Sequence, residues 1–133
     1  MYKITRTRIV EQLEIDDNGT KTVLDVDINA ENILKDYNQA QYAIAQAQMA
    51  AQKAKNDQDV AAAEQAMGEA VLALFRVIFG QDQLDKILQI YDGKPLEMLA
   101  DIAPFITDVI TPRIQETQQR IQERYKQIHA GKK

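Results

Sequence analysis

The feature that most constrains this chain is a change in the spacing of its apolar residues near Asn29. Between Thr22 and Ile28, apolar and polar residues largely alternate, which is typical of a strand with one solvated face. Beyond Asn29, apolar residues recur at three-, four- and seven-residue steps, as on the buried face of a helix. The sequence therefore predicts a mainly helical α+β fold in a single domain of 133 residues. We expect a β-hairpin over residues 1–28, followed by a four- to five-helix bundle over residues 29–133.

The predicted hairpin has its turn at Asn18-Gly19, because this pair readily takes the positive φ angles that a tight turn requires. Ile9, Leu13 and Ile15 form a less regular first strand, and a phase change near Arg8 indicates a bulge. Two strands alone are only marginally stable in water. We therefore expect the hairpin to pack on the helices or to pair with another subunit.

Two long helices are expected next, one capped by Asn29 and ending near Lys55, the other capped by Asp57 or Asp59 and ending near Phe79. Both are rich in alanine, which favours the helix and leaves a smooth surface. A short connection between two alanine-lined faces predicts a long antiparallel pair in close contact.

Gly68 lies inside the second of these helices, where glycine is about 1 kcal/mol less favourable than alanine. Two interpretations remain open. Either a backbone of the first helix or of another subunit approaches closely at this point, or the position is simply a suboptimal one.

Three further helices are expected in the rest of the chain. Gly80 is predicted to end the second helix as a C-cap, and Asp92-Gly93 to end a short third helix. Pro95 suits the first turn of a fourth helix, within which Pro104 predicts a kink or a break. Thr111-Pro112 is expected to begin the final helix, with the threonine as its N-cap.

On the final helix, Ile114, Ile121 and Ile128 repeat every seven residues. This narrow apolar row fits either a coiled-coil seam or the edge of the bundle, and we favour the bundle edge. The segment from Pro112 to Lys133 carries six basic and two acidic residues, so its charge is +4 and the preceding residues sum to −8. The cations suit a helix C-terminus, and the acidic body argues against a nucleic-acid partner.

The chain lacks the sets of residues that catalysis or metal binding requires. It has no cysteine, its single histidine is His129 near the C-terminus, and its glycines are isolated rather than gathered in a phosphate loop. Asp25 and Asp27 are separated by one residue and resemble a metal-binding pair. However, strand alternation places both on the solvated face, and no residues follow at the spacing of a calcium-binding loop. We expect no enzymatic activity, no metal and no cofactor.

The chain also lacks signals for membranes or export. Its first residues contain no apolar run suited to a signal peptide, and no stretch approaches the ~20 apolar residues of a membrane span. The sequence therefore predicts no membrane partner and a cytoplasmic location.

Large apolar residues crowd the stretch from the second helix to the fourth, whereas the first helix has few. Such an uneven supply of bulk indicates that part of it is shared with a partner. Recognition of a helix in a groove uses surfaces of this kind, and methionine adapts to different partner side chains. The predicted protein-binding residues are Phe79, Leu84, Ile87, Leu88, Tyr91, Met98, Ile102 and Phe105.

The segment from Phe79 to Gly93 contains a Phe-Gly helix end, then the pair Ile87-Leu88, then a Tyr-x-Gly. The helix from Pro95 to Ile110 follows, leading into Thr-Pro-Arg-Ile. This stretch resembles the small tail assembly chaperones of long-tailed, siphovirus-like phages and prophages of Gram-positive bacteria. A β-hairpin start and a helical remainder are similar to that family as well.

The resemblance implies a chaperone that binds the long helical tape-measure protein and keeps it soluble in the host cytoplasm during tail assembly. It also implies self-association along that client, as a homo-oligomer. Two other classes remain open: a structural neck or tail-completion protein of the phage particle, and a helical adaptor or regulator such as a toxin-neutralising partner.

Overall fold

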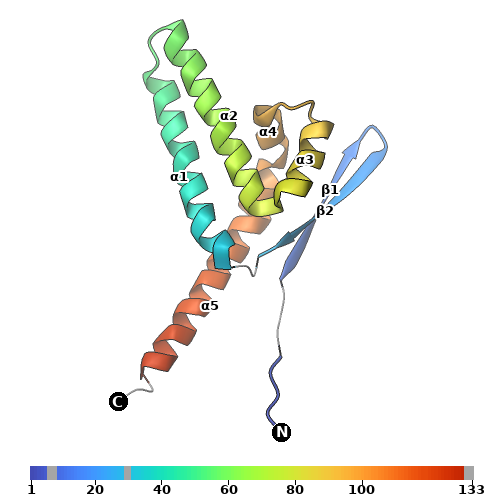
Figure 1. Cartoon of the computed structure of the whole chain (residues 1–133), viewed down its shortest axis with the longest axis vertical. Coiled ribbons are helices and arrows are strands. Elements are labelled where there is room, and N and C mark those ends of the chain that lie inside the picture. Colours follow the sequence, from blue (N-terminus) through green and yellow to red (C-terminus); the bar gives the residue numbers. More distant parts are fainter. Residues whose placement is uncertain (6–8, 29–30, 131–133) are drawn as a thin grey trace.

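The computed structural model describes residues 1–5, 9–28 and 31–130. Figure 1 shows α1 and α2 as a long pair, α3 and α4 between α2 and the hairpin, and α5 running away below them. The predicted hairpin, helical remainder and long antiparallel helix pair are thereby confirmed. The elements in chain order are β1 Val10–Asp17, β2 Thr20–Asp27, α1 Glu31–Lys53, α2 Asp57–Phe79, α3 Gln81–Ile90, α4 Pro95–Phe105, the π-helical turn η1 Ile106–Ile110 and α5 Thr111–Ala130.

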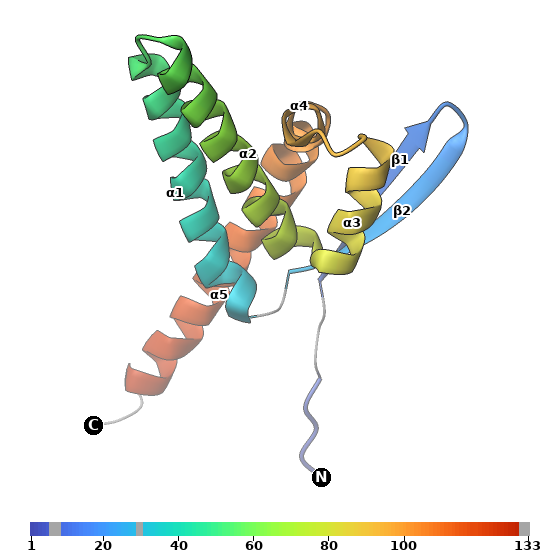
Figure 2. The same ribbon diagram turned by 45° about the horizontal axis from the view of Figure 1, so that its top comes forward.

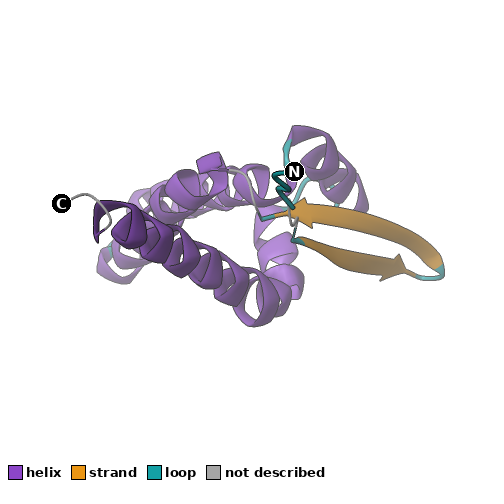
Figure 3. Cartoon of the chain, turned by 90° about the horizontal axis from the view of Figure 1, so that it is seen from below, coloured by secondary structure: helices purple, strands orange, loops and turns teal. Residues whose placement is uncertain are grey.

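The hairpin forms as the turn chemistry predicts. β1 and β2 pair antiparallel with Asp17 opposite Thr20, and the two residues between them, Asn18-Gly19, have φ angles of 50° and 96°. The bulge expected near Arg8 lies outside the described residues. Seen from below, the hairpin extends to one side of the helices, and the end of α5 lies on the other (Figure 3). The alternation in β2 is confirmed, since Leu24 and Val26 are fully buried, and Ile28 directly after the strand continues the pattern.

The start of α2 corrects one expectation. The N-cap is Asn56, whose extended backbone precedes the first helical residue and whose side-chain oxygen accepts a 2.8 Å hydrogen bond from the Asp59 N–H. Asp57 and Asp59 already lie inside the helix, where their charges favour its first turn. The cap that was predicted at Asn29 lies outside the described residues.

Glycine and proline mark the other boundaries as predicted. Gly80 has a φ of 81°, and its N–H donates to the Arg76 carbonyl at the end of α2. The backbone turns at Asp92-Gly93, where both residues have positive φ angles. Pro95 occupies the first turn of α4, where its missing N–H leaves no bond unmade.

The cap expected at Thr111 is wrong, whereas the kink or break expected at Pro104 takes the form of a change in helix type, since α4 ends at Phe105 and the π-helical turn begins at Ile106. Hydrogen bonding resumes after the proline, because the Ile106 N–H donates to the carbonyls of Ile102 and Ala103. The Thr111 N–H then donates to the Ile106 carbonyl, five residues back, which is the bond of a π-turn. Thr111 itself has helical φ and ψ angles. α4, η1 and α5 therefore form one continuous helical run, with the wider turn placed just before Pro112.

One core cluster joins the hairpin to every helix. It centres on the C-terminal half of α2, where Val71, Leu74 and Phe75 have at most 1% of their surface exposed. α2 contacts α1, α3, α4 and β2, so it is the central element of the fold. The first turns of α5 reach this core through Ile114, and the Tyr37 hydroxyl of α1 hydrogen bonds the Thr111 hydroxyl there.

The interpretation of α5 as an edge of the bundle is correct only for its first turns. Ile114 is 1% exposed and Thr117 is 7% exposed, whereas Ile121 and Ile128 are 48% and 59% exposed. The helix simply outruns the body that it packs against. Figure 2 shows its C-terminal half standing clear of the other elements.

Gly68 does not mark a close backbone contact within this chain. A Cβ atom there would meet only the Cγ of Pro95 among the described residues, at an ordinary contact distance of 3.8 Å. The position therefore has room for alanine.

Candidate helix-binding groove

The eight residues predicted to bind a partner lie mostly in the core. Leu84, Ile87 and Met98 have at most 1% of their surface exposed, and Phe79 and Ile102 have 5% and 3%. Leu88, Tyr91 and Phe105 are partly buried against the same cluster. In this conformation the five buried side chains offer no surface to a partner, and the crowding noted in the sequence is accounted for by the fold's own packing.

Two of these residues show how tightly the region closes. The Phe79 ring packs between those of Phe75 and Phe105, with centroid distances of 5.6 and 6.5 Å. Burial, a hydrogen bond to the Asp101 carboxylate and the negative charges of Asp101 and Asp17 together raise the pKa of Tyr91 to about 12, and burial is the largest of these causes. The phenol therefore stays protonated at neutral pH and serves as a structural donor.

Exposed apolar side chains gather elsewhere. Among the described residues they lie on the outer face of the hairpin, on the outer half of the α1–α2 pair, at the start of α4 and on the second half of α5. Beyond those in the first five residues, they are Val10, Val23, Tyr42, Met49, Val60, Leu96, Ile121, Tyr125 and Ile128.

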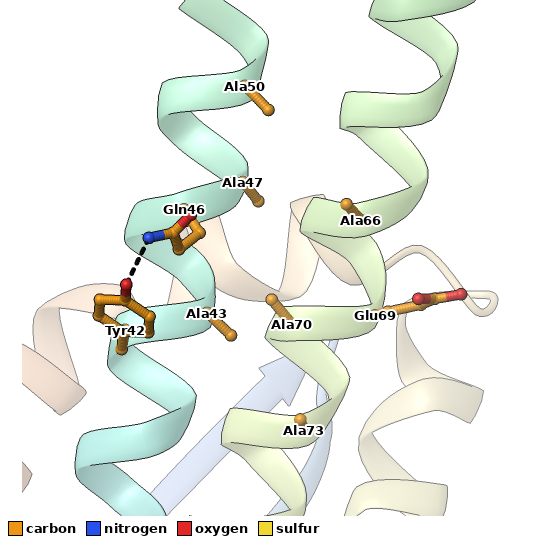
Figure 4. Close-up of a pocket in the computed structure, with 9 residues that line it drawn as sticks. All are labelled: Tyr42, Ala43, Gln46, Ala47, Ala50, Ala66, Glu69, Ala70 and Ala73. Carbon is orange, nitrogen blue, oxygen red and sulfur yellow. Dashed lines mark hydrogen bonds between the residues drawn. The ribbon is translucent and has the colours of Figure 1, made fainter.

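A shallow groove of about 700 Å³ runs between α1 and α2. Its floor is made of alanine methyl groups, three from each helix, which face one another across the gap in Figure 4. The groove forms because alanine lets the two helices pack closely while leaving nothing tall enough to fill the surface between them. We call this feature the alanine groove, and its floor residues are Ala43, Ala47, Ala50, Ala66, Ala70 and Ala73.

The rim of the alanine groove is polar. On the α1 side the Gln46 amide donates a 2.7 Å hydrogen bond to the Tyr42 hydroxyl, and on the α2 side stands the Glu69 carboxylate. Tyr42 is 66% exposed, so its ring is available to a partner. An apolar floor with one acid and one aromatic ring at its rim suits binding of an amphipathic helix.

The opposite face of the same helix pair carries a second groove, of about 490 Å³. Ala51 and Ala63 contribute to it, together with Met67 and the exposed Leu96 at the start of α4. Both faces of the outer half of α1 and α2 are thus open, whereas the inner half is covered by α3, α4 and the hairpin.

The described residues contain no group of three or more His, Cys, Asp or Glu side chains placed to hold an ion. Neither groove lining contains histidine, serine or cysteine. The geometry fits recognition of another chain.

Sequence reasoning did not identify the alanine groove, although a signal was present. In each helix the floor residues follow the spacing i, i+4 and i+7, which on its own predicts only that they pack the pair together. The distinguishing signal is Tyr42, a large aromatic residue directly before Ala43. Its ring is too large to lie between two closely packed helices.

Within the described chain, no helix combines the length and apolar character needed to cross a membrane. In comparisons with known proteins, no protein-family model, no curated protein and no solved structure matches the chain.

Proposed function

We propose that this protein binds an extended amphipathic helix of another protein, and that it is a tail assembly chaperone whose client is a phage tape-measure protein. The observation that carries the proposal is the alanine groove, open to solvent between two antiparallel helices of 23 residues each. Helices of that length extend about 34 Å, and the floor of the groove covers about 10 Å of them, so a client helix has about two turns of contact available.

The groove suits a helical client for physical reasons. Its methyl floor removes apolar client side chains from water and lets the client backbone approach closely, while the amide and carboxylate at the rim remain solvated. The acidic body, with a charge of −8 over residues 1–111, keeps such a complex soluble.

The shallowness of the groove also fits a chaperone. Stable complexes bury about 800 Å² on each partner, and a shallow groove on a chain this small provides a weaker, reversible contact. Many weak contacts along one long client are easily exchanged when the tail tube assembles. This consideration supports binding by several copies at once, as the sequence resemblance implies.

Co-expression with a fragment of a tape-measure protein tests the proposal. The wild-type chain should hold the fragment in the soluble fraction and co-purify with it. Ala66→Glu places a carboxylate on the floor of the groove, where a bound helix would have to desolvate it, and binding should fall at least about tenfold.

Ala61→Glu is the matched control, since Ala61 is exposed on the same helix and lines neither groove. It should leave binding unchanged. Equal binding by both variants, or no effect of the wild-type chain on the fragment, would rule the proposal out. Detection of the protein in purified phage particles would favour a structural neck or tail-completion protein. Retention of the protein on DNA at modest salt would favour a helical regulator.

A further inference from the structure

The two outer edges of the hairpin differ. At the edge of β2, the Gln83 side chain of α3 accepts a 2.8 Å hydrogen bond from the Asp25 N–H and donates one of 2.7 Å to the Asp25 carbonyl. At the edge of β1, the described part of the chain supplies no third strand, since β1 and β2 make up the whole sheet. An uncovered strand edge offers backbone donors and acceptors to another strand. The open side of the hairpin is therefore that of β1.

The pairing of the hairpin shows which backbone groups this open side presents. The Ile28 N–H donates to the Ile9 carbonyl, so these two residues form a hydrogen-bonded pair. Bonded and non-bonded pairs alternate along antiparallel strands, and Leu13 with Leu24 therefore belongs to the bonded set. The alternate residues of β1 turn their N–H and C=O groups outward, and we call them the β1 edge: Val10, Gln12, Glu14 and Asp16.

The two faces of β1 differ as well. Leu13 lies opposite Leu24, on the hairpin face that is turned to the core. Leu24 has no exposed surface, whereas Leu13 and Ile15 remain partly exposed on that face. The other face carries the exposed acids Glu14 and Asp16. A strand added along the β1 edge should therefore have apolar side chains on one face and a cation on the other.

The residues Met1–Thr5, which we call the arm, have this pattern. The arm stands clear of the other elements (Figures 1 and 2), and Tyr2 and Ile4 are 91% and 82% exposed. When the arm is extended as a strand, these two apolar side chains point to one face and Lys3 points to the other.

Antiparallel pairing along the β1 edge matches the arm in both respects. Lys3 opposite Glu14 brings a cation and an anion together on the outer face. The same register places Tyr2 opposite Ile15, and the second apolar side chain of the arm opposite Leu13. The β1 edge carries two acids and no base, and the arm carries one base and no acid. Pairing of two β1 edges would instead bring like charges together, which disfavours it.

The arm that fits the β1 edge is that of a second copy. To reach its own β1, the arm would require the chain to reverse at Arg6-Thr7-Arg8, directly before the hairpin. This stretch contains no glycine, asparagine, aspartate or proline, the residues that favour tight turns. A separate copy meets no such requirement.

We propose that the arm of one copy adds as a third strand to the β1 edge of a second copy. Every copy supplies both an arm and an edge, so each docked arm leaves further sites for association. The inference goes beyond the proposed function, because neither the arm nor the β1 edge lines the alanine groove. Copies joined through their arms keep their grooves free for a client.

Cysteine cross-linking tests the pairing directly, because the chain contains no cysteine. Chains with Lys3→Cys are mixed under mild oxidation with chains carrying Glu14→Cys. Cα atoms directly opposite each other in a bonded pair lie about 5.5 Å apart, which suits a disulfide. Mixed disulfide-linked dimers are expected. Lys21→Cys is the control, since this exposed residue shares the outer face of the hairpin but belongs to β2, and it should not react with the arm.

A chain that carries both Lys3→Cys and Glu14→Cys tells the two possible sources of the arm apart. Docking on a second copy predicts disulfide-linked dimers and larger species. An arm that folds back on its own β1 would give disulfide-linked monomers instead, and this result would overturn the inference.

Mass measurement over a dilution series provides a second test. The wild-type chain should grow in mean mass with concentration, and Tyr2→Ser with Ile4→Ser should raise the dissociation constant at least about tenfold. Both residues lie outside the core cluster, so the variant should keep the circular dichroism of the wild type. Met49→Ser with Val60→Ser is the matched control, because these two residues are also exposed and apolar. It should associate like the wild type.

A charge swap tests the register. Lys3→Glu should raise the dissociation constant of self-association about three- to tenfold, because it places a second anion beside Glu14. Adding Glu14→Lys to the same chain restores opposite charges and should return association to the wild-type level. A double variant that associates no better than Lys3→Glu alone would contradict the pairing of these two residues.

Two further results would overturn the inference: a wild-type chain that is monomeric at every concentration, and a Tyr2→Ser, Ile4→Ser variant that associates normally. A failure here is distinguishable from a failure of the proposed function. Ala66→Glu alters the alanine groove but neither the arm nor the β1 edge, so it should weaken client binding and leave self-association unchanged.

Discussion

The inner and outer halves of this molecule use side chains of opposite size. In the inner half, the C-terminal part of α2 packs with α3, α4 and β2 around large residues such as Phe75, Ile87 and Met98, none of which has measurable exposure. In the outer half, α1 and α2 meet through alanine and leave grooves on both faces. The comparison teaches that the chain closes on itself where it has bulk, and that it leaves binding surface where bulk is lacking.

The largest expected effect on stability comes from comparing one aromatic residue of the inner half with one of the outer half. Phe75→Ala should reduce the free energy of unfolding by about 3–5 kcal/mol, because it leaves a cavity at the centre of the core. Tyr42→Ala, at the exposed rim of the alanine groove, should change it by less than about 0.5 kcal/mol. Urea unfolding followed by circular dichroism measures both. Similar losses in the two variants would contradict the division into a closed and an open half.

A second test compares two isoleucines seven residues apart on α5. Ile114→Ala should lower the free energy of unfolding by about 2–5 kcal/mol, since that side chain is buried in the core cluster. Ile121→Ala should be nearly neutral in a dilute, monomeric sample, because half of the side chain already faces solvent. A large loss for Ile121→Ala would mean that α5 packs differently from the geometry described above.

The third prediction concerns the hairpin's attachment to the inner half. The Gln83 side chain accepts a 2.8 Å hydrogen bond from the Asp25 N–H and donates 2.7 Å bonds to the carbonyls of Asp25 and Phe79. It thereby covers the outer edge of β2 as a neighbouring strand would. Gln83→Ala should lower the free energy of unfolding by about 1–2 kcal/mol and speed amide hydrogen exchange in β2. Gln89→Ala, on the exposed side of the same helix, is the control and should do neither.

The smallest expected effect is a gain. Gly68→Ala should raise the free energy of unfolding by about 0.5–1 kcal/mol, because alanine favours the helix and, of the described residues, the new methyl group meets only the Pro95 ring, at 3.8 Å. Thermal unfolding is sufficient to detect it. A loss of stability, with reduced self-association, would instead mean that a neighbouring copy approaches the backbone at this point.

Much of the fold was predictable because its signals act over a few residues. Asn18-Gly19 sets the turn through its own φ angles, and Gly80 and Pro95 mark helix ends through backbone chemistry that needs no distant partner. The cap at Asn56 was missed because Asp57 and Asp59 are equally good caps in isolation. At Thr111, a π-turn connects two helical segments that local rules would separate.

The site was less predictable than the fold. The predicted protein-binding residues from Phe79 to Phe105 stand out in the sequence by their large apolar side chains. Large apolar side chains are also the ones that a core most often buries. The apolar surface that remains open includes the alanine floor and the exposed Ile121 and Ile128 of α5, neither of which differs in sequence from an ordinary packing face. Gln83 gave no signal at all, because its partners lie 58 residues away in β2.

The sequence by itself determined where this chain is strand, where it is helix and which residues share each face, because periodicity, turns and caps depend on near neighbours. Only the tertiary structure decided which of those faces are covered. Ile114 and Ile121 belong to the same row on the same helix, yet the body reaches one and ends before the other. Burial depends on how far distant segments extend in space, and that distance is not written in the local pattern.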